Sequence, residues 1–262
     1  FKQNPIKANL KAIGEEIAKA RKLSPNGIIG MNFMSIDPHY NEYVTEAVKH
    51  GIDLIISGAG LPLALPKLVK NSKTKIMPIV SSVRACRLVL TSWLKKDNRI
   101  PDGIVVEGPK AGGHLGFKME DLQNGTMQTL DEALTDVVNF VKDFEQKHNV
   151  NIPVIAAGGI NSHEDIERVS NLGASGVQIG TAFVATEECD ASDDFKQTYV
   201  NAKPEDARII LSPTGFPARA VNTDFVKKAY DTDGIAVKHC YGCMTGICNP
   251  KTTRYCLSDN IS

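Results

Sequence analysis

Short apolar runs alternate with longer stretches of helical periodicity over the first 186 residues of the chain. The short runs are rich in β-branched residues and are bounded by glycine or polar residues, a pattern that is typical of buried strands. The candidate strands cover residues 27–32, 52–57, 75–80, 103–107, 152–157 and 176–180. Helices are predicted between them, for example over 6–21, where Leu10, Ile13 and Ile17 share one face, and over 130–148.

Strands that are apolar on both faces and separated by helices predict a parallel sheet covered by helices. An open doubly wound sheet and a closed βα barrel both meet this description. The chain carries neither G-x-G-x-x-G nor a Walker A sequence, and polar or glycine-rich residues follow nearly every strand, which favours the barrel. We therefore predict an α/β fold, a (β/α)8 TIM barrel over residues 1–186, whose first two βα units are expected upstream of Phe1.

The alternation of strand and helix patterns ends after residue 186. A polar helical stretch there precedes SPTGFPARAVNT, a segment with two prolines and a glycine. Residues 187–262 are predicted to form a smaller helical lid domain with a cysteine-rich tail.

The balance of positive and negative residues argues against nucleic acid and anionic membranes as partners. The chain has 30 Lys and Arg against 30 Asp and Glu and a pI near 7.1, so no excess of positive charge is available to meet nucleic acid or an anionic membrane. No run approaches the roughly 20 apolar residues of a membrane span, and the opening lacks the apolar core of a signal peptide. We expect a soluble cytoplasmic protein that acts on a small molecule.

Two adjacent strand ends are candidates for a phosphate site, namely 156–160 (AAGGI) and 176–181 (GVQIGT). Glycines let the backbone approach a ligand closely, and exposed N–H groups at such positions bind anions. Late strand ends of a βα barrel often hold a phosphate in this way. The alternative is that Gly158, Gly159 and Gly180 only make tight turns.

A histidine stands in a glycine-rich loop, EGPKAGGHLG, directly after the strand at 103–107. Gly112 and Gly113 leave room for a large planar group, and the imidazole of His114 can exchange protons near neutral pH. The alternative for His114 is a structural or solvated side chain, which is also the expectation for the other five histidines.

Four cysteines lie close together near the carboxyl end with the spacing C-x2-C-x4-C-x7-C, namely Cys240, Cys243, Cys248 and Cys256. Thiols of a cytosolic protein at such spacing suggest zinc or an iron–sulfur cluster more than disulfides. The spacing matches neither a zinc ribbon nor a ferredoxin, so simple structural thiols remain the alternative.

The sequences EGPKAGGHLG, IPVIAAGGI, GASGVQIGTAFVAT and SPTGFPARAVNT, in this order, resemble the FMN-dependent nitronate monooxygenase family, which includes the enoyl-ACP reductase II enzymes. The resemblance implies a βα barrel that binds FMN at the carboxyl ends of its strands, with His114 as the catalytic base or as the residue that polarises the substrate. It implies a set of cofactor-binding residues: Asn32, Gly58, Glu107, Gly112, Gly113, Ala157, Gly158, Gly159, Gln178, Gly180 and Thr181.

The leading hypothesis is a nitronate monooxygenase that converts alkyl nitronates with dioxygen to a carbonyl compound and nitrite. The runner-up is an enoyl-ACP reductase that uses NAD(P)H as co-substrate, and a third reading, from another class, is a non-catalytic binding protein stabilised by a metal at the cysteines. A homodimer is compatible with each of them.

Overall fold

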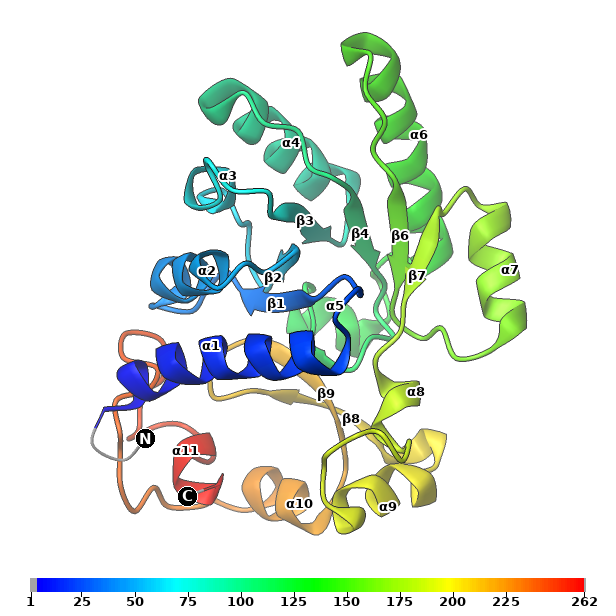
Figure 1. Cartoon of the computed structure of the whole chain (residues 1–262). Helices are drawn as coiled ribbons and strands as arrows, with labels where there is room; N and C mark the ends of the chain where they lie inside the picture. Colours follow the sequence, from blue (N-terminus) through cyan, green and yellow to red (C-terminus); the bar gives the residue numbers. More distant parts are fainter. Residues whose placement is uncertain (1–3, 262) are drawn as a thin grey trace.

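A curled parallel sheet organises the protein in the computed structural model, which describes residues 4–261 (Figure 1). Its strands follow one another in the order β1-β2-β3-β4-β6-β7. They comprise β1 (Gly30–Met34), β2 (Leu54–Gly58), β3 (Lys75–Val80), β4 (Ile104–Glu107), β6 (Val154–Ala157) and β7 (Gly176–Gln178). All six predicted strands are present, and the predicted fold class, a section of a βα barrel, is confirmed.

One helix precedes the first strand and others follow the strands, and they pack on the outer, convex face of the sheet (Figure 1). They are α1 (Pro5–Leu23), α2 (Tyr40–Lys49), α3 (Leu65–Leu68), α4 (Val83–Asp97), α6 (Leu130–His148) and α7 (His163–Asn171). The helix predicted over 130–148 has these bounds because its limits are local: a capping box formed by Thr129 and Glu132 starts it, and Asn149 ends it in the left-handed region at φ 52°.

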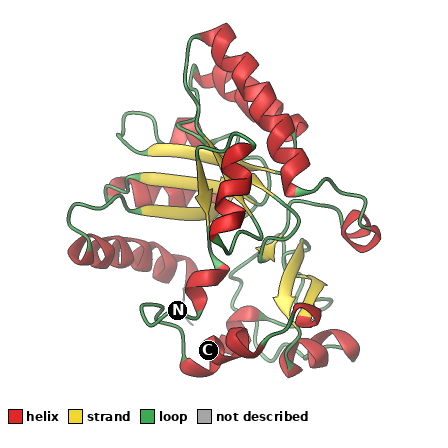
Figure 2. Ribbon diagram, turned by 90° about the vertical axis from the view of Figure 1, so that its right-hand side faces the viewer, coloured by secondary structure: helices red, strands yellow, loops and turns green. Residues whose placement is uncertain are grey.

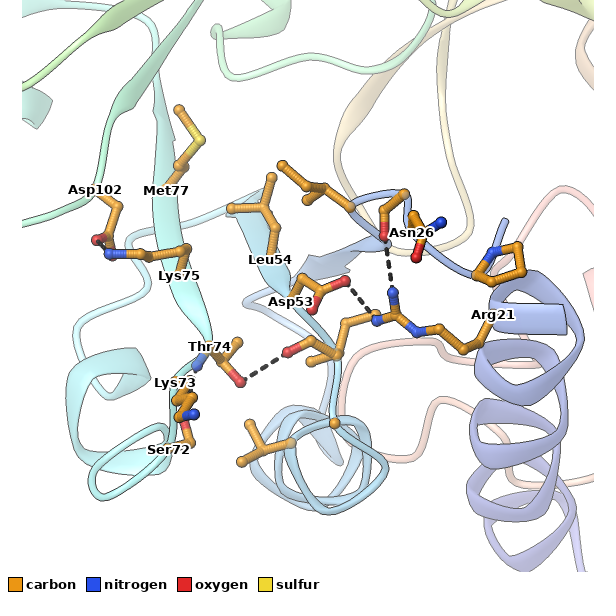
Figure 3. A pocket seen from close by; sticks show the side chains of 16 residues that line it. Arg21, Asn26, Asp53, Leu54, Ser72, Lys73, Thr74, Lys75, Met77 and Asp102 are labelled. Atoms are coloured by element: carbon orange, nitrogen blue, oxygen red, sulfur yellow. Dashed lines mark hydrogen bonds and ion pairs between the residues drawn. The ribbon is translucent and has the colours of Figure 1, made fainter. Parts of the chain in front are cut away.

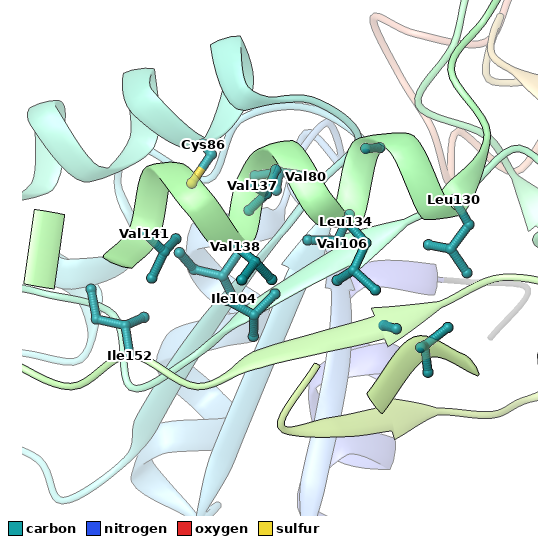
Figure 4. Packing of buried hydrophobic residues seen from close by; sticks show 14 of the residues in the cluster. Val80, Cys86, Ile104, Val106, Leu130, Leu134, Val137, Val138, Val141 and Ile152 are labelled. Atoms are coloured by element: carbon teal, nitrogen blue, oxygen red, sulfur yellow. The ribbon is translucent and has the colours of Figure 1, made fainter. Parts of the chain in front are cut away.

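Two apolar clusters join the helices to the sheet. In the first, Leu134, Val137 and Val141 of α6 pack on Ile104 and Val106 of β4 (Figure 4). The second lies under α1, α2 and α4, where Trp93 is fully buried and donates a hydrogen bond from Nε1 to the Pro62 carbonyl. Because side chains alternate along a strand, Ile104 and Val106 face the helices, so Glu107 points to the inner, concave face.

The segment after residue 186 contains strands as well as the predicted helices. After α8 (Thr181–Val184) come α9 (Asp193–Asn201), a 3-10 turn (Pro204–Asp206), β8 (Ala207–Leu211), β9 (Pro217–Val221), α10 (Asp224–Asp231) and α11 (Leu257–Ile261). Strands β8 and β9 form a small antiparallel sheet with β5 (Gly113–His114), which comes from the loop after β4; α5 (Met119–Asn124) follows β5. Figure 2 shows this sheet apart from the large one. The segment after residue 186 is therefore joined to the loop that carries His114 through the pairing of β5 with β9.

Within residues 4–261, no helix combines the length and the apolar character that a membrane span requires.

Candidate functional site

Three residues form a row across the carboxyl edge of the sheet, on its concave face, and the first and the last of them are polar. Glu107 of β4 pairs in register with Ala157 of β6, and Ala157 pairs with Gln178 of β7. Residues that pair in a parallel sheet point to the same face, and neighbouring strands lie about 4.8 Å apart. The carboxyl and amide groups therefore flank a gap that the small side chain of Ala157 leaves open.

These residues form the floor of a cavity of about 580 Å³, a size within the range of ordinary ligand sites. The other walls come from the loops after β4, β6 and β7 and from the appended segment, which contributes Tyr199, Lys203 and Arg219. Nine of the predicted cofactor-binding residues line the cavity: Glu107, Gly112, Gly113, Ala157, Gly158, Gly159, Gln178, Gly180 and Thr181.

The glycines of this cavity differ in whether backbone conformation or close packing requires a residue without a side chain. Gly158 and Gly159 have φ of +95° and +78°, and a Cβ on Gly158 would lie 2.9 Å from the Gly108 carbonyl oxygen. The turn after β6 therefore needs glycine even without a ligand. At Gly180 φ is −119°, and a Cβ would have nothing within 4 Å. Neither the backbone nor packing requires glycine at position 180, so its missing side chain only keeps the cavity open.

Two polar groups on the cavity floor lack a protein partner that would satisfy them. The Oε1 atom of Gln178 is buried and accepts no hydrogen bond within the described residues. Burial raises the pKa of Glu107 to about 7, because the charged carboxylate loses its hydration there. A buried acceptor without a donor is costly unless a ligand or water supplies the donor. The cavity floor thus has the chemistry of a binding site for a polar group.

His114 lies beside this cavity but is not among the residues that line it. Strand β5 pairs with β9, and the Nε2 atom of His114 lies 3.0 Å from Ser212 Oγ and 3.1 Å from Thr214 Oγ1, in the β8–β9 connection. Burial lowers the pKa of His114, so the ring is neutral at neutral pH. Ser212 and Thr214, which contact His114, were not predicted as site residues from the sequence, although they belong to the SPTGFPARAVNT motif.

Arg219 fastens the histidine loop to the small sheet. Its Nε donates to the Ala111 carbonyl at 3.2 Å and its Nη2 to the Pro109 carbonyl at 2.9 Å. The guanidinium also lines the cavity, together with the exposed Lys110. The sequence alone gave no reason to assign Arg219 this contact, because the partners are backbone carbonyls more than 100 residues away along the chain.

Asn32 and Gly58, two further predicted cofactor-binding residues, lie on β1 and β2 and do not line this cavity. Asn32 is exposed and pairs with Ile56. Gly58 is buried, and a Cβ there would lie 2.9 Å from the Cβ of Ile79, so close packing accounts for this glycine. The structure does not bring these two residues to the polar row.

A larger cavity of about 810 Å³ opens at the other end of the strands, near the start of β2 and β3 (Figure 3). Four of its charged groups form two ion pairs: Arg21 Nη2 lies 2.5 Å from Asp53 Oδ2, and Lys75 Nζ lies 2.8 Å from Asp102 Oδ1. Barrel enzymes build their active sites at the carboxyl ends of the strands, and the opposite end serves stability. We therefore assign the candidate site to the smaller cavity.

For the four cysteines of the tail, the sequence left a metal site and simple structural thiols as alternatives. No group of three or more His, Cys, Asp and Glu side chains among these residues is arranged to hold a metal ion. Cys243 Sγ instead accepts a hydrogen bond from Ser258 Oγ at 2.9 Å, and burial, followed by the neighbouring thiols, raises the pKa of Cys248.

Comparisons with known proteins place this geometry in context. The family model described as nitronate monooxygenase matches residues 2–250. A probable nitronate monooxygenase of Staphylococcus saprophyticus is 27% identical over 204 residues, covering 75% of this chain and 54% of that protein. The chain thus spans about half the length of this curated relative.

Two solved structures share the fold. FabK from Thermotoga maritima superposes with a TM-score of 0.68 at 27% identity, covering 85% of this chain and 63% of that one. The nitroalkane oxidase of Streptomyces ansochromogenes superposes with a TM-score of 0.54 at 23% identity, covering 82% of this chain and 57% of that one. At the lower identity the likeness concerns the fold alone.

Proposed function

Since this chain belongs to the nitronate monooxygenase family, we propose that it forms the cofactor-binding part of an FMN-dependent oxidoreductase that oxidises alkyl nitronates. The observation that carries the proposal is the polar floor of the cavity, where the unpartnered Oε1 of Gln178 and the carboxyl group of Glu107 flank Ala157. A flavin ring has a polar edge with a hydrogen-bond donor, and this donor would satisfy the buried oxygen of Gln178.

The residues of the cavity fit FMN in type. Gln178 and Glu107 would bind the polar edge of the ring, and Gly112 and Gly113 would lie along its face. The phosphate would be held by the turn after β6 and the residues after β7, namely Ala157, Gly158, Gly159, Gly180 and Thr181, with the positive charge of Lys110 and Lys203 in the same cavity. FMN, when bound, supplies the electron transfer, and the protein orients it and tunes its potential.

His114 is the proposed proton acceptor when a neutral nitroalkane, rather than the nitronate, is the substrate. The α-carbon–hydrogen bond breaks and its electron pair forms the carbon–nitrogen double bond of the nitronate. The π electron pair of the nitrogen–oxygen double bond moves onto that oxygen, and the proton passes to the imidazole. Burial lowers the pKa of His114, so the ring is in the neutral, proton-accepting form at physiological pH. The site is a small-molecule site, and dimerisation remains a prediction.

The test of this function is an anaerobic titration of the full-length purified protein, loaded with FMN, with propyl-2-nitronate, NADH and crotonyl thioester in turn. We expect the nitronate to bleach the flavin absorbance near 450 nm and dioxygen to restore it with release of nitrite. A protein that stays colourless after incubation with FMN would contradict both flavoenzyme hypotheses.

A pair of variants tests the cavity itself. Gln178→Leu should weaken FMN binding about fivefold or more, because one hydrogen bond to a buried partner contributes roughly 1 kcal/mol or more. Gln146→Leu, which changes an exposed glutamine on α6, is the matched control. Equal FMN dissociation constants for the two variants, measured by fluorescence quenching, would contradict the assignment of the site.

The second candidate function is an NAD(P)H-dependent enoyl-ACP reductase. The observation in its favour is the structural likeness to FabK, an enoyl-ACP reductase II. In that reaction a hydride passes from nicotinamide to the flavin and then to the enoyl thioester. Rapid anaerobic bleaching by NADH, reoxidation by crotonyl thioester and no reaction with the nitronate would favour this function over the first.

A further inference from the structure

The turn between β8 and β9 brings two hydroxyl groups to one nitrogen of His114. Nε2 lies 3.0 Å from Ser212 Oγ and 3.1 Å from Thr214 Oγ1, and the two hydroxyl oxygens lie 2.7 Å apart. Both hydroxyl residues are only 7% exposed. Three polar atoms within mutual hydrogen-bond distance, shielded from water, define one small network.

The hydrogens available to this network are compatible with both tautomers of the ring, and each tautomer leaves a different nitrogen free to accept a proton. If Nε2 carries its proton, it donates to one hydroxyl, that hydroxyl donates to the other, and the second hydroxyl keeps its proton for an outside acceptor. If Nε2 carries a lone pair, it accepts from a hydroxyl, and the proton sits on Nδ1. Because both hydroxyls can accept as well as donate, the network admits the Nε2–H form, in which Nδ1 carries the lone pair.

The turn that carries the two hydroxyls is itself fixed. Ser212 N–H donates to the Phe216 carbonyl at 2.9 Å, and Gly215 N–H, at φ +80°, donates to the Ser212 carbonyl at 2.9 Å. Strand β5 has only two residues, one of which is Gly113 at φ +72°, so the loop has little rigidity of its own. The hydroxyls therefore hold the imidazole, and not the reverse.

We propose that Ser212 and Thr214 are positioning residues that hold the His114 ring with its proton on Nε2, so that Nδ1 accepts the proton of the substrate. This role rests on the proposed function of His114 as the proton acceptor. When the α-carbon–hydrogen bond of a nitroalkane breaks, the proton goes to Nδ1 and the hydroxyls keep accepting from Nε2–H. The charged ring then retains its hydrogen bonds, although neither hydroxyl carries a charge.

The charged groups around the loop do not supply an alternative explanation for the state of the ring. Arg219 on β9 directs its guanidinium to the carbonyls of Pro109 and Ala111, and Glu107 lies on the floor of the cavity at the end of β4. Burial alone accounts for the lowered pKa of His114, with no contribution from a charged residue. The two hydroxyls are thus the groups whose removal changes the ring directly.

The experiment measures the tautomer of His114 in the full-length, FMN-loaded protein. Long-range proton–nitrogen spectra of protein labelled with ¹⁵N-histidine distinguish Nε2–H from Nδ1–H, and His114→Gln identifies the signal. We expect the Nε2–H form in the parent and a mixture of tautomers in the Ser212→Ala/Thr214→Val double variant. The double variant should also have a lower His114 pKa than the parent protein, because the charged ring loses its acceptors.

Two further variants separate positioning from folding. Both single variants keep Ser212. Thr214→Ser also keeps a hydroxyl at position 214 and should retain the Nε2–H tautomer of the parent protein, whereas Thr214→Val should not. Thr45→Val, which removes an exposed hydroxyl on α2 that donates to the Asn41 carbonyl, is the control for the loss of a hydroxyl. In the nitroalkane reaction we expect kcat of the double variant to fall about tenfold with KM little changed.

The outcomes are distinct from those of the proposed function. An Nδ1–H tautomer in the parent, or an unchanged tautomer and pKa in the double variant, would overturn the positioning role. A parent protein that turns over neither nitroalkane nor enoyl thioester would overturn the proposed function, while the tautomer spectra would still decide what Ser212 and Thr214 do.

Discussion

Replacing Glu107 by glutamine removes a carboxyl group whose ionisation opposes folding. Burial raises its pKa from 4.5 to about 7. Each pKa unit corresponds to about 1.4 kcal/mol, so ionisation of Glu107 in the folded protein should cost about 3 kcal/mol. The neutral glutamine keeps the shape of the side chain and avoids this cost.

The sign follows from the two states of the protein. Below pH 4.5 the carboxyl group is protonated in both the folded and the unfolded chain and makes no difference. Between 4.5 and about 7 the unfolded chain loses the proton first, so the parent loses stability relative to Glu107→Gln as the pH rises. Above the folded pKa both states are ionised, and the difference stays constant.

The assay is urea unfolding of the FMN-free, full-length parent and variant, followed by circular dichroism at about pH 5 and pH 8. The stability difference between the two proteins should grow by about 2.5 kcal/mol in favour of the variant between these pH values. The subtraction cancels every other titrating group, His114 included. Glu120→Gln, an exposed change on α5, controls for the loss of a surface charge. A parent-to-variant difference that is equal at both pH values would refute the reasoning.

Three further substitutions test the site and the fold. Arg219→Met removes two hydrogen bonds to loop carbonyls and should lower the free energy of unfolding by about 2 kcal/mol. An unchanged urea midpoint would contradict the stabilising role of these two hydrogen bonds. Gly158→Ala should cost about 2 kcal/mol more than Gly125→Ala in thermal unfolding, because both have positive φ but only Gly158 has a carbonyl in the way. Thr129→Ala removes the cap of α6 and should cost about 1 kcal/mol by the same assay, whereas a cost near zero would mean that the cap is redundant.

Much of the large sheet follows from local patterns. Helix α6 has the predicted bounds because its apolar stripe and both of its caps lie within its own sequence. The first strand begins at Gly30 rather than at residue 27, because its pairing with β2 starts only where Gly30 meets Leu54. The apolar run continues ahead of that point, so the run marks the presence of a strand more reliably than its first residue.

The nine cavity residues that the sequence predicted all lie at the ends of strands β4, β6 and β7 or in the segments that directly follow them. Parallel strands bring their carboxyl ends to one edge of the sheet, so recognising the strands was enough to bring these residues together. Asn32 lies in the middle of β1 and Gly58 ends β2, and the walls of the cavity do not extend to either residue. The order of strands and loops in the sequence places residues at the carboxyl edge of the sheet. It does not determine which of the strands along that edge line the cavity.

The sequence by itself determined the parallel α/β architecture, the six strands and the glycine-rich turns, because hydrophobic period and turn chemistry are properties of consecutive residues. The tertiary structure alone decided the surroundings of His114. Its partners lie about 100 residues further along the chain, in the turn between β8 and β9, two short strands that form only by pairing with β5 and with each other. The same holds for Glu107, whose raised pKa depends on how completely distant segments exclude water from one carboxyl group.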